Sequence, residues 1–162
     1  MIRINRLTDY GIVLLTHVAS QPIEKTHNAR DLASETHLPA PVVSKILKHL
    51  ARTGLLVSQR GVKGGYRLSR NPKDISVAEV IRSLEGPIAI TDCTIDSVSG
   101  MIGPCGNSSV CSVHGNWQKI NQVVEEALAG ISLVEMIGPA RGCAVKIDFG
   151  DIGNEAGGVG PS

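Results

Sequence analysis

The chain has 162 residues, four cysteines and 2% aromatic residues, and its formal net charge at pH 7 is +1. Its length is enough for one domain, or two small ones, with a real hydrophobic core. No apolar run approaches the roughly 20 residues of a membrane span and no segment resembles a signal peptide, so we expect a cytoplasmic protein without a membrane partner. The scarcity of aromatic residues disfavours proteins that stack single-stranded bases.

The small net charge conceals two halves of opposite sign. Residues 1–73 contain 12 lysines and arginines against 4 acidic residues, whereas residues 74–162 contain 4 against 11. A basic half attracts polyanions. The first half is therefore predicted to bind nucleic acid, and duplex DNA in particular, while the second half has another task.

Three helices are predicted in this basic half. Apolar residues at helical spacing predict the first over 7–19, with Asp9 in its first turn, and a shorter second helix over 29–36. The third has Pro41 in its first turn and Gly54 at its end. Its apolar stripe consists of Val43, Ile46, Leu47 and Leu50. Its opposite face is polar and basic and carries Ser44, Lys45, Lys48, His49 and Arg52.

A β-hairpin is predicted directly after the third helix. Short strands are expected at 55–58 and 66–68, on either side of the glycine-rich sequence Arg60-Gly61-Val62-Lys63-Gly64-Gly65. Helices followed by a basic hairpin predict a winged helix-turn-helix, whose third helix enters the major groove. The candidate DNA contacts are Ser44 and Lys45 for bases, Lys48 on the same face, and Arg60 and Lys63 in the wing for phosphates or the minor groove.

Two further helices are predicted in the acidic half. The capping box of Ser76 and Glu79 opens a helix that Gly86 closes. A longer helix over about 116–129 has an apolar stripe that we interpret as a dimerisation surface, with a place in the core of the single chain as the alternative. The stripe consists of Trp117, Ile120, Val124, Ala127, Leu128 and Ile131. A second capping box, Ser132 with Glu135, predicts a short last helix, and a glycine-rich tail from residue 150 is expected to be disordered.

A loop of about 20 residues between these helices carries the chemistry. It contains Cys93, Cys105 and Cys111, separated by 11 and then 5 residues, and His114 follows. Cysteines stay reduced in the cytoplasm, so a cluster of them indicates metal binding or redox chemistry. From the residues alone, an iron-sulfur cluster, a zinc ion and a thiol-disulfide pair all remain open. The fourth cysteine, Cys143, stands apart and is interpreted as a bystander.

Over residues 1–137 the chain resembles the Rrf2 family of winged-helix transcription regulators. The resemblance rests on Leu7-Thr8-Asp9-Tyr10-Gly11, on the strand and glycine-rich sequence up to Tyr66, on the three cysteines, and on the helix near Trp117. Within the family the chain is most similar to regulators of iron-sulfur assembly operons. The 11-residue gap between Cys93 and Cys105 is longer than is usual in the family.

The resemblance implies that Cys93, Cys105 and Cys111 bind an iron-sulfur cluster, with [2Fe-2S] favoured over [4Fe-4S]. Family members take the fourth ligand either from a histidine after the third cysteine or from an aspartate in the first helix of the partner subunit. His114 matches the first arrangement and is favoured, because it shares the loop with the cysteines. Asp9 matches the second, although a carboxylate in a first helical turn is stabilised by the helix dipole whatever else it does.

We therefore expect a mainly α-helical protein with a small β wing, in three parts. These are a winged helix-turn-helix DNA-binding domain over 1–73, a helix, cluster loop and dimerisation helix over 74–137, and a partly disordered tail over 138–162. The expected function is a homodimeric DNA-binding repressor of iron-sulfur assembly genes that senses cluster, iron, redox or nitric oxide status. Alternatives are a winged-helix regulator with structural zinc, a thiol-disulfide sensor, and a thiol redox enzyme, which the lack of a Cys-x-x-Cys motif disfavours.

Overall fold

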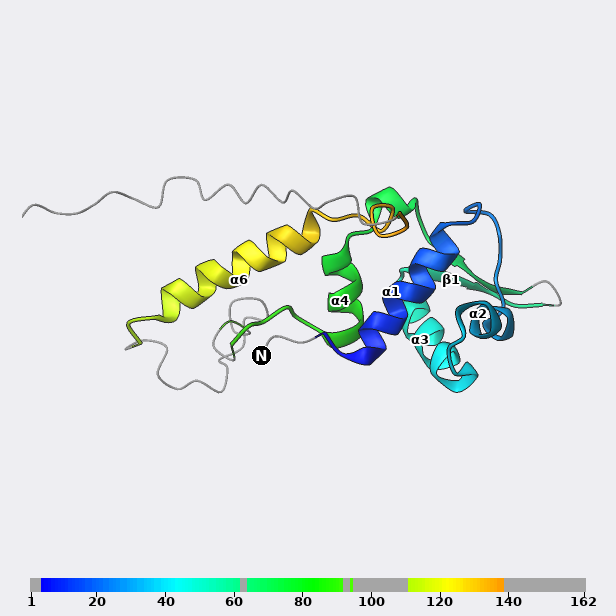
Figure 1. The fold of residues 1–162 in the computed structure, drawn as a ribbon, viewed down its shortest axis with the longest axis horizontal. Coiled ribbons are helices and arrows are strands. Elements are labelled where there is room, and N and C mark those ends of the chain that lie inside the picture. Colours follow the sequence, from blue (N-terminus) through cyan, green and yellow to red (C-terminus); the bar gives the residue numbers. More distant parts are fainter. Residues whose placement is uncertain (1–3, 62–63, 92–93, 95–110, 139–162) are drawn as a thin grey trace, which may run out of the picture.

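The computed structural model describes residues 4–61, 64–91, 94 and 111–138. Helices α1 (Arg6–Ala19), α2 (Ala29–Thr36), α3 (Ala40–Arg52) and α4 (Val77–Glu85) form one body with strands β1 (Leu56–Gln59) and β2 (Gly65–Leu68) and the short 3-10 helix η1 (Pro72–Asp74) (Figure 1). Helix α6 (His114–Ala129) extends away from this body (Figure 1). The prediction of a mainly helical chain with a small β wing is confirmed.

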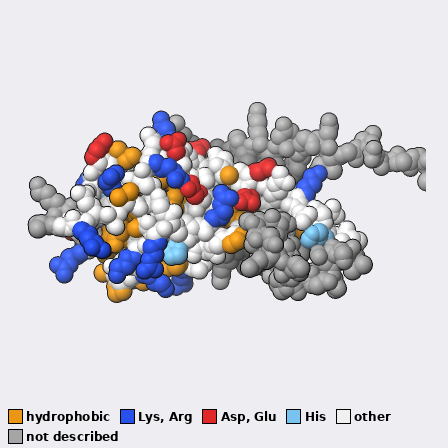
Figure 2. Space-filling view, turned by 180° about the vertical axis from the view of Figure 1, so that it is seen from behind, with side chains coloured by type: hydrophobic (Ala, Val, Ile, Leu, Met, Phe, Trp, Pro, Cys, Tyr) orange, Lys and Arg blue, Asp and Glu red, His pale blue; other side chains and the backbone are white. Residues whose placement is uncertain are grey.

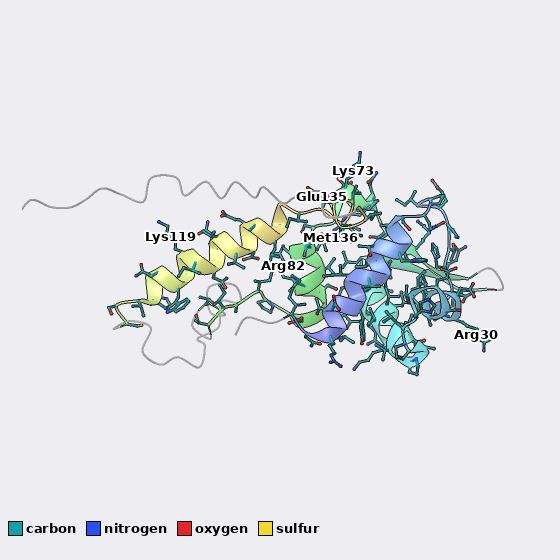
Figure 3. All side chains as sticks on the ribbon, in the orientation of Figure 1. Arg30, Lys73, Arg82, Lys119, Glu135 and Met136 are labelled. Carbon is teal, nitrogen blue, oxygen red and sulfur yellow. The ribbon has the colours of Figure 1, made fainter. Side chains whose placement is uncertain are left out.

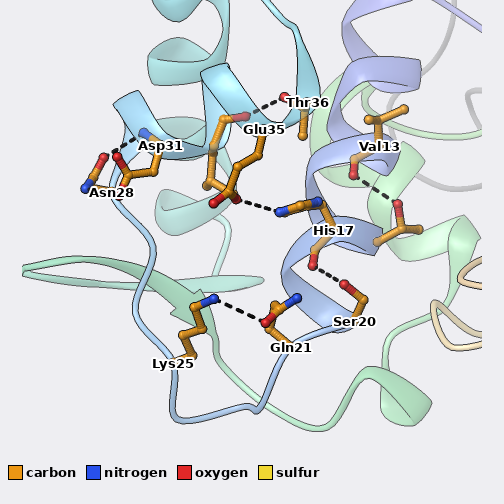
Figure 4. A network of polar contacts seen from close by, with 11 residues as sticks. Val13, His17, Ser20, Gln21, Lys25, Asn28, Asp31, Glu35 and Thr36 are labelled. Atoms are coloured by element: carbon orange, nitrogen blue, oxygen red, sulfur yellow. Dashed lines mark hydrogen bonds and ion pairs between the residues drawn. The ribbon is translucent and has the colours of Figure 1, made fainter.

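The first three helices begin and end where the local sequence predicts. The Asn5 side chain accepts a hydrogen bond from the N–H of Leu7 at the start of α1, and Asn28 accepts one from Asp31 at the start of α2. Helix α3 begins after Pro39 with a proline in its first turn and ends before Gly54, which has a φ of +83°. An ion pair of 2.7 Å between Nε2 of His17 and Oε2 of Glu35 joins α1 to α2 (Figure 4).

The two strands form an antiparallel hairpin whose register places Leu56 opposite Leu68 and Gln59 opposite Gly65. The segment before α2 adds one more pair of backbone bonds to this hairpin: His27 N–H donates to Tyr66 O at 2.9 Å, and Tyr66 N–H donates to His27 O at 2.7 Å. Sequence patterning did not predict this bridge. It attaches the base of the wing to the helices.

The hydrophobic core lies between α1, α2, α3 and the hairpin, and it extends to α4. Leu14, Leu32, Ile46 and Leu50 are fully buried in it, and the four stripe residues of α3 are all buried as predicted. The chain returns to this core after α6, because Leu133 is fully buried and its N–H donates to Ile75 O at 2.8 Å.

Helix α6 contacts its own chain through polar side chains. Asn121 is 5% exposed, and Arg82 of α4 pairs with Glu125 at 2.7 Å (Figure 3). Trp117 and Ile120 of the predicted apolar stripe lie at the surface instead, with exposed fractions of 36% and 45%. A helix in water normally buries its apolar face, so we expect Trp117 and Ile120 to need a partner beyond the residues that the structure describes.

The prediction of a short helix opened by Ser132 and Glu135 is wrong. Residues 132–137 form consecutive turns with hydrogen bonds between residues three apart, such as Met136 N–H to Leu133 O at 3.2 Å. Only half of the predicted capping box forms: Oε2 of Glu135 accepts from both N–H and Oγ of Ser132, but the N–H of Glu135 donates to the carbonyl oxygen of Ser132 and not to its hydroxyl. Burial of Leu133 and the bridge from Ser76 to Ser132 hold this segment in turns. Residues 139–162, which include Cys143 and all but the first residue of the tail predicted over 138–162, lie outside the described residues. In the part of the chain that the structure describes, no helix is long and apolar enough to cross a membrane.

Candidate nucleic-acid interface and sensor segment

The solvent-facing side of α3 is basic. Lys45, Lys48 and Arg52 are exposed and Ser44 is half-buried, and the sequence of α3 contains no acidic residue. In the space-filling view, lysine and arginine side chains gather along one edge of the helical body, while the acidic side chains lie toward the opposite edge with further basic side chains among them (Figure 2). One edge of the body is therefore basic.

Two shallow grooves flank this basic side. One lies between α3 and the hairpin and is lined by Lys48, Ala51, Arg52, Ser58 and Tyr66. The other lies toward the start of α1 and is lined by Leu7, Lys45, Ile46, Lys48, His49 and Arg52. Lys48 and Arg52 line both grooves, so Arg52 joins the candidate DNA contacts although sequence analysis did not select it. Its place seven residues after Lys45 on an amphipathic helix is the signal that could have identified it.

The wing presents one described candidate. Arg60 is exposed just after β1, while Lys63 lies outside the described residues. The base of the wing requires glycine, because a Cβ built on Gly65 would lie 2.4 Å from the carbonyl oxygen of His27. The bridge between His27 and Tyr66 therefore sets where Arg60 projects relative to α3.

His49 is exposed and lines the second groove, but its ring also contacts α4. Its Nε2 donates to the carbonyl oxygen of Ser83 in α4 at 2.5 Å, and the hydroxyls of Thr53 and Ser83 lie 2.6 Å apart. These contacts attach the carboxyl end of α3 to α4. The basic helix and α4 are thus joined by polar contacts as well as by the core.

The start of α6 brings two of the predicted metal ligands together. Cys111 is an exposed, free cysteine, and the N–H of His114 donates to Cys111 O at 3.3 Å. Nδ1 of His114 is buried and has no hydrogen-bond partner among the described residues. A free thiol and, three residues later, an imidazole nitrogen without a partner among the described residues are donor types that zinc or an iron-sulfur cluster accepts, so these two residues fit such a group by their chemistry.

The remaining predicted ligands are not brought together by the described residues. Cys93 and Cys105 lie outside the described residues, and among those that are described no three histidine, cysteine or carboxylate side chains gather to hold a metal ion. Asp9 is exposed in the first turn of α1. Helix α6 begins at its far end, away from the helical body that contains α1 (Figure 1). Within one chain, Asp9 is thus remote from His114.

Sequence reasoning missed Asn121, which binds the backbone just before Cys93. Its Oδ1 accepts from Ile90 N–H and its Nδ2 donates to Ile88 O, both at 2.9 Å. An asparagine in a helix is unremarkable in the sequence, and only the fold shows that its amide is buried against another segment.

Comparison with known proteins identifies the family. The family model described as "Rrf2: Iron-dependent Transcriptional regulator" matches residues 4–139. The chain belongs to the Rrf2 family of transcriptional regulators. This confirms the resemblance stated from the sequence, and it agrees with the expectation of a regulator rather than an enzyme.

Individual relatives of this Rrf2-family chain are distant. The HTH-type transcriptional regulator IscR of Aliivibrio salmonicida is 27% identical over 128 residues, which cover 79% of this chain and 73% of that protein. The solved structure of T. potens IscR is 26% identical, with a TM-score of 0.60 over 84% of this chain and 86% of that one. CymR, the global cysteine regulator of B. subtilis, has a TM-score of 0.64 at 24% identity over 85% of this chain and 97% of that one, which shows the common fold.

Proposed function

We propose that this Rrf2-family chain is a dimeric repressor of iron-sulfur assembly genes that binds duplex DNA and senses cluster, iron, redox or nitric oxide status. The observation that carries the proposal is the exposed basic side of α3, which is attached at its carboxyl end to α4. Helix α4 in turn leads into the segment that contains Cys93. Helix α4 thus contacts the proposed DNA-binding helix and is followed in the chain by the first cysteine, so a change at the cysteines would act on α3 through α4.

On the DNA side, Ser44 and Lys45 would contact bases in the major groove, since they lie on the outer side of α3 near its start. Lys48 and Arg52 would neutralise phosphates on either side of the groove. Arg60 and Lys63 would reach the minor groove or its phosphates from the wing.

On the sensor side, Cys93, Cys105, Cys111 and His114 would hold a [2Fe-2S] cluster, with Asp9 of the partner subunit as the alternative fourth ligand. When bound, the cluster would hold these ligands together, and oxidants, nitric oxide or iron shortage would remove the cluster. Nδ1 of His114 is buried without a partner among the described residues, which supports its role, because a buried imidazole nitrogen without a hydrogen bond is costly unless a ligand uses it.

The exposed apolar stripe of α6 supports the dimer. Trp117 and Ile120 present a large apolar area to water, and pairing two copies of α6 would bury it. Two copies of α3 related by a two-fold axis would then meet half-sites about one helical turn of DNA apart.

The decisive experiment is anaerobic purification followed by iron and sulfide analysis, visible absorption and promoter footprinting with and without the cluster. We expect a coloured protein with iron and labile sulfide that changes its footprint when the cluster is removed. Cys105→Ser should abolish the colour and leave the dimer folded, whereas Cys143→Ser, the matched control, should keep it. A colourless protein with stoichiometric zinc would refute the proposal.

A thiol-disulfide sensor is the second candidate, because Cys111 is exposed and free and therefore open to oxidants. It predicts that an iron-free protein changes its DNA affinity on treatment with peroxide and recovers with a dithiol. The cluster sensor predicts no such response from the iron-free protein.

A further inference from the structure

The groove between α3 and the hairpin is lined on each side by a pair of polar side chains. On the helix side, Lys48 and Arg52 are four residues apart, so they lie on the same side of α3, one turn from each other. On the hairpin side, Ser58 of β1 and Tyr66 of β2 are direct partners in the antiparallel register. The groove thus brings two cations from the helix and two hydroxyls from the hairpin to one place.

The two hydroxyl residues lie on the face of the hairpin that packs against α3. Side chains two residues apart in a strand share a face, so Ser58 and Tyr66 lie on the same face as the paired residues Leu56 and Leu68. Both leucines are 2% exposed and belong to the core that also contains the apolar stripe of α3. The same face of the hairpin therefore continues from the core into the groove. Two backbone bonds to His27 fix the strand that carries Tyr66.

The groove contains hydrogen-bond donors and positive charge without a matching anion. None of the described residues that line it is acidic, and Lys48, Arg52, Ser58 and Tyr66 can all donate hydrogen bonds. Within the part of the chain that the structure describes, the two cations form no ion pair and the two hydroxyls no hydrogen bond. Like charges one turn apart repel each other, and an anion bound between them offsets that repulsion. Such a set of donors matches the oxygens of a phosphate group.

We propose that this groove binds one phosphate of the DNA backbone, which accepts hydrogen bonds from the hydroxyls of Tyr66 and Ser58 as well as from Lys48 and Arg52. This inference rests on the proposed DNA-binding function, and it adds two neutral donors from the hairpin to the basic contacts of α3. A phosphate held between α3 and the hairpin fixes the position of α3 on the duplex. It carries no sequence information, so the groove contributes affinity for any duplex.

The test compares Tyr66→Phe with Tyr10→Phe in binding a duplex of arbitrary sequence. Tyr66→Phe removes one hydroxyl and keeps the ring and the backbone bonds to His27. Tyr10 is the other tyrosine of the chain, and Tyr10→Phe is the matched control because Tyr10 is half-buried in α1 and lines neither groove. We expect Tyr66→Phe to weaken binding roughly tenfold and Tyr10→Phe to leave it unchanged. A neutral hydroxyl releases no counterion, so Tyr66→Phe should keep the slope of log K against log salt, whereas Arg52→Ala should reduce it by about 0.9.

A double-mutant cycle tests whether the tyrosine and the arginine hold the same phosphate. Tyr66→Phe should weaken binding less in an Arg52→Ala background than in the wild type, because the phosphate is then already held less firmly. Circular dichroism checks that each variant is folded, and Ser58→Ala, at an exposed position, replaces Tyr66→Phe if that variant does not fold.

The inference is overturned if folded Tyr66→Phe binds the duplex as tightly as Tyr10→Phe, or if the effects of Tyr66→Phe and Arg52→Ala are strictly additive. If the wild-type protein binds no duplex at all, the proposed function fails instead. Titration with inorganic phosphate, followed by the NMR signal of the Ser58 amide, then decides the role of the groove separately. A shift in the wild type that is smaller in Tyr66→Phe supports phosphate binding by the groove, and equal shifts or none refute it.

Discussion

Replacing Gly65 with alanine should damage the base of the wing, because the new Cβ would meet a backbone that cannot move aside. It would lie 2.4 Å from the carbonyl oxygen and 2.7 Å from the carbonyl carbon of His27, at a φ of +156°. Relief of this clash separates β2 from the His27 segment and breaks the two backbone bonds between His27 and Tyr66. Each bond contributes about 0.5–1.5 kcal/mol and the backbone strain about 1–2 kcal/mol, so we expect the free energy of unfolding to fall by about 2–5 kcal/mol.

The assay is equilibrium unfolding in urea, and Gly61→Ala is the matched control. Gly61 has a φ of +115° in the same hairpin, but a Cβ there would have no atom within 4 Å. In Gly61→Ala only the backbone strain should act, so its free energy of unfolding should fall by about 1–2 kcal/mol. If the free energies of unfolding of Gly65→Ala and Gly61→Ala differ by less than about 0.5 kcal/mol, the clash with His27 does not determine the geometry of the wing.

The other predictions concern the interface, the dimer and pH. Lys48→Ala should weaken promoter binding and reduce the slope of log K against log salt by about 0.9, as measured by titration at several salt concentrations, and an unchanged slope would contradict a phosphate contact. His49→Ala should weaken binding several-fold with the slope unchanged, because it removes the bond to α4 rather than a DNA contact; a reduced slope would place His49 on DNA. Trp117→Asp should yield monomers in analytical ultracentrifugation while Lys119→Asp stays dimeric, and a dimeric Trp117→Asp would remove α6 from the interface. Burial, followed by the charge of a nearby lysine, lowers the pKa of His27 from its ordinary 6.5, so the folded state resists its protonation. Wild-type stability should then fall as pH decreases through 6.5, and the urea midpoint should drop less between pH 7.5 and 5.5 in His27→Gln; equal drops would contradict this.

Most of the secondary structure could be predicted because it depends on local chemistry. The stripe of α3, Pro41 and Gly54 set the limits of that helix without reference to the rest of the fold, and the glycines of the wing mark the hairpin. The failure came at Ser132, where a correct capping pattern did not produce a helix. Burial of Leu133 in the core overrides the local preference there, and a capping pattern contains no information about burial.

The candidate site, like the secondary structure, could be predicted from the sequence only in part. Its chemical character follows from composition: basic residues on one helix face predict DNA, and three cysteines with a histidine predict a soft-ligand centre. Whether His49 faces DNA or α4 depends on the packing of α3 against Ser83, which is 34 residues away in the chain. The sequence by itself determined which residues carry charge and which carry ligands, because those are properties of the side chains. Only the tertiary structure decided that a buried asparagine binds the backbone of Ile88 and Ile90 and that Trp117 and Ile120 of α6 lie at the surface, since both depend on segments far apart in the chain meeting in space.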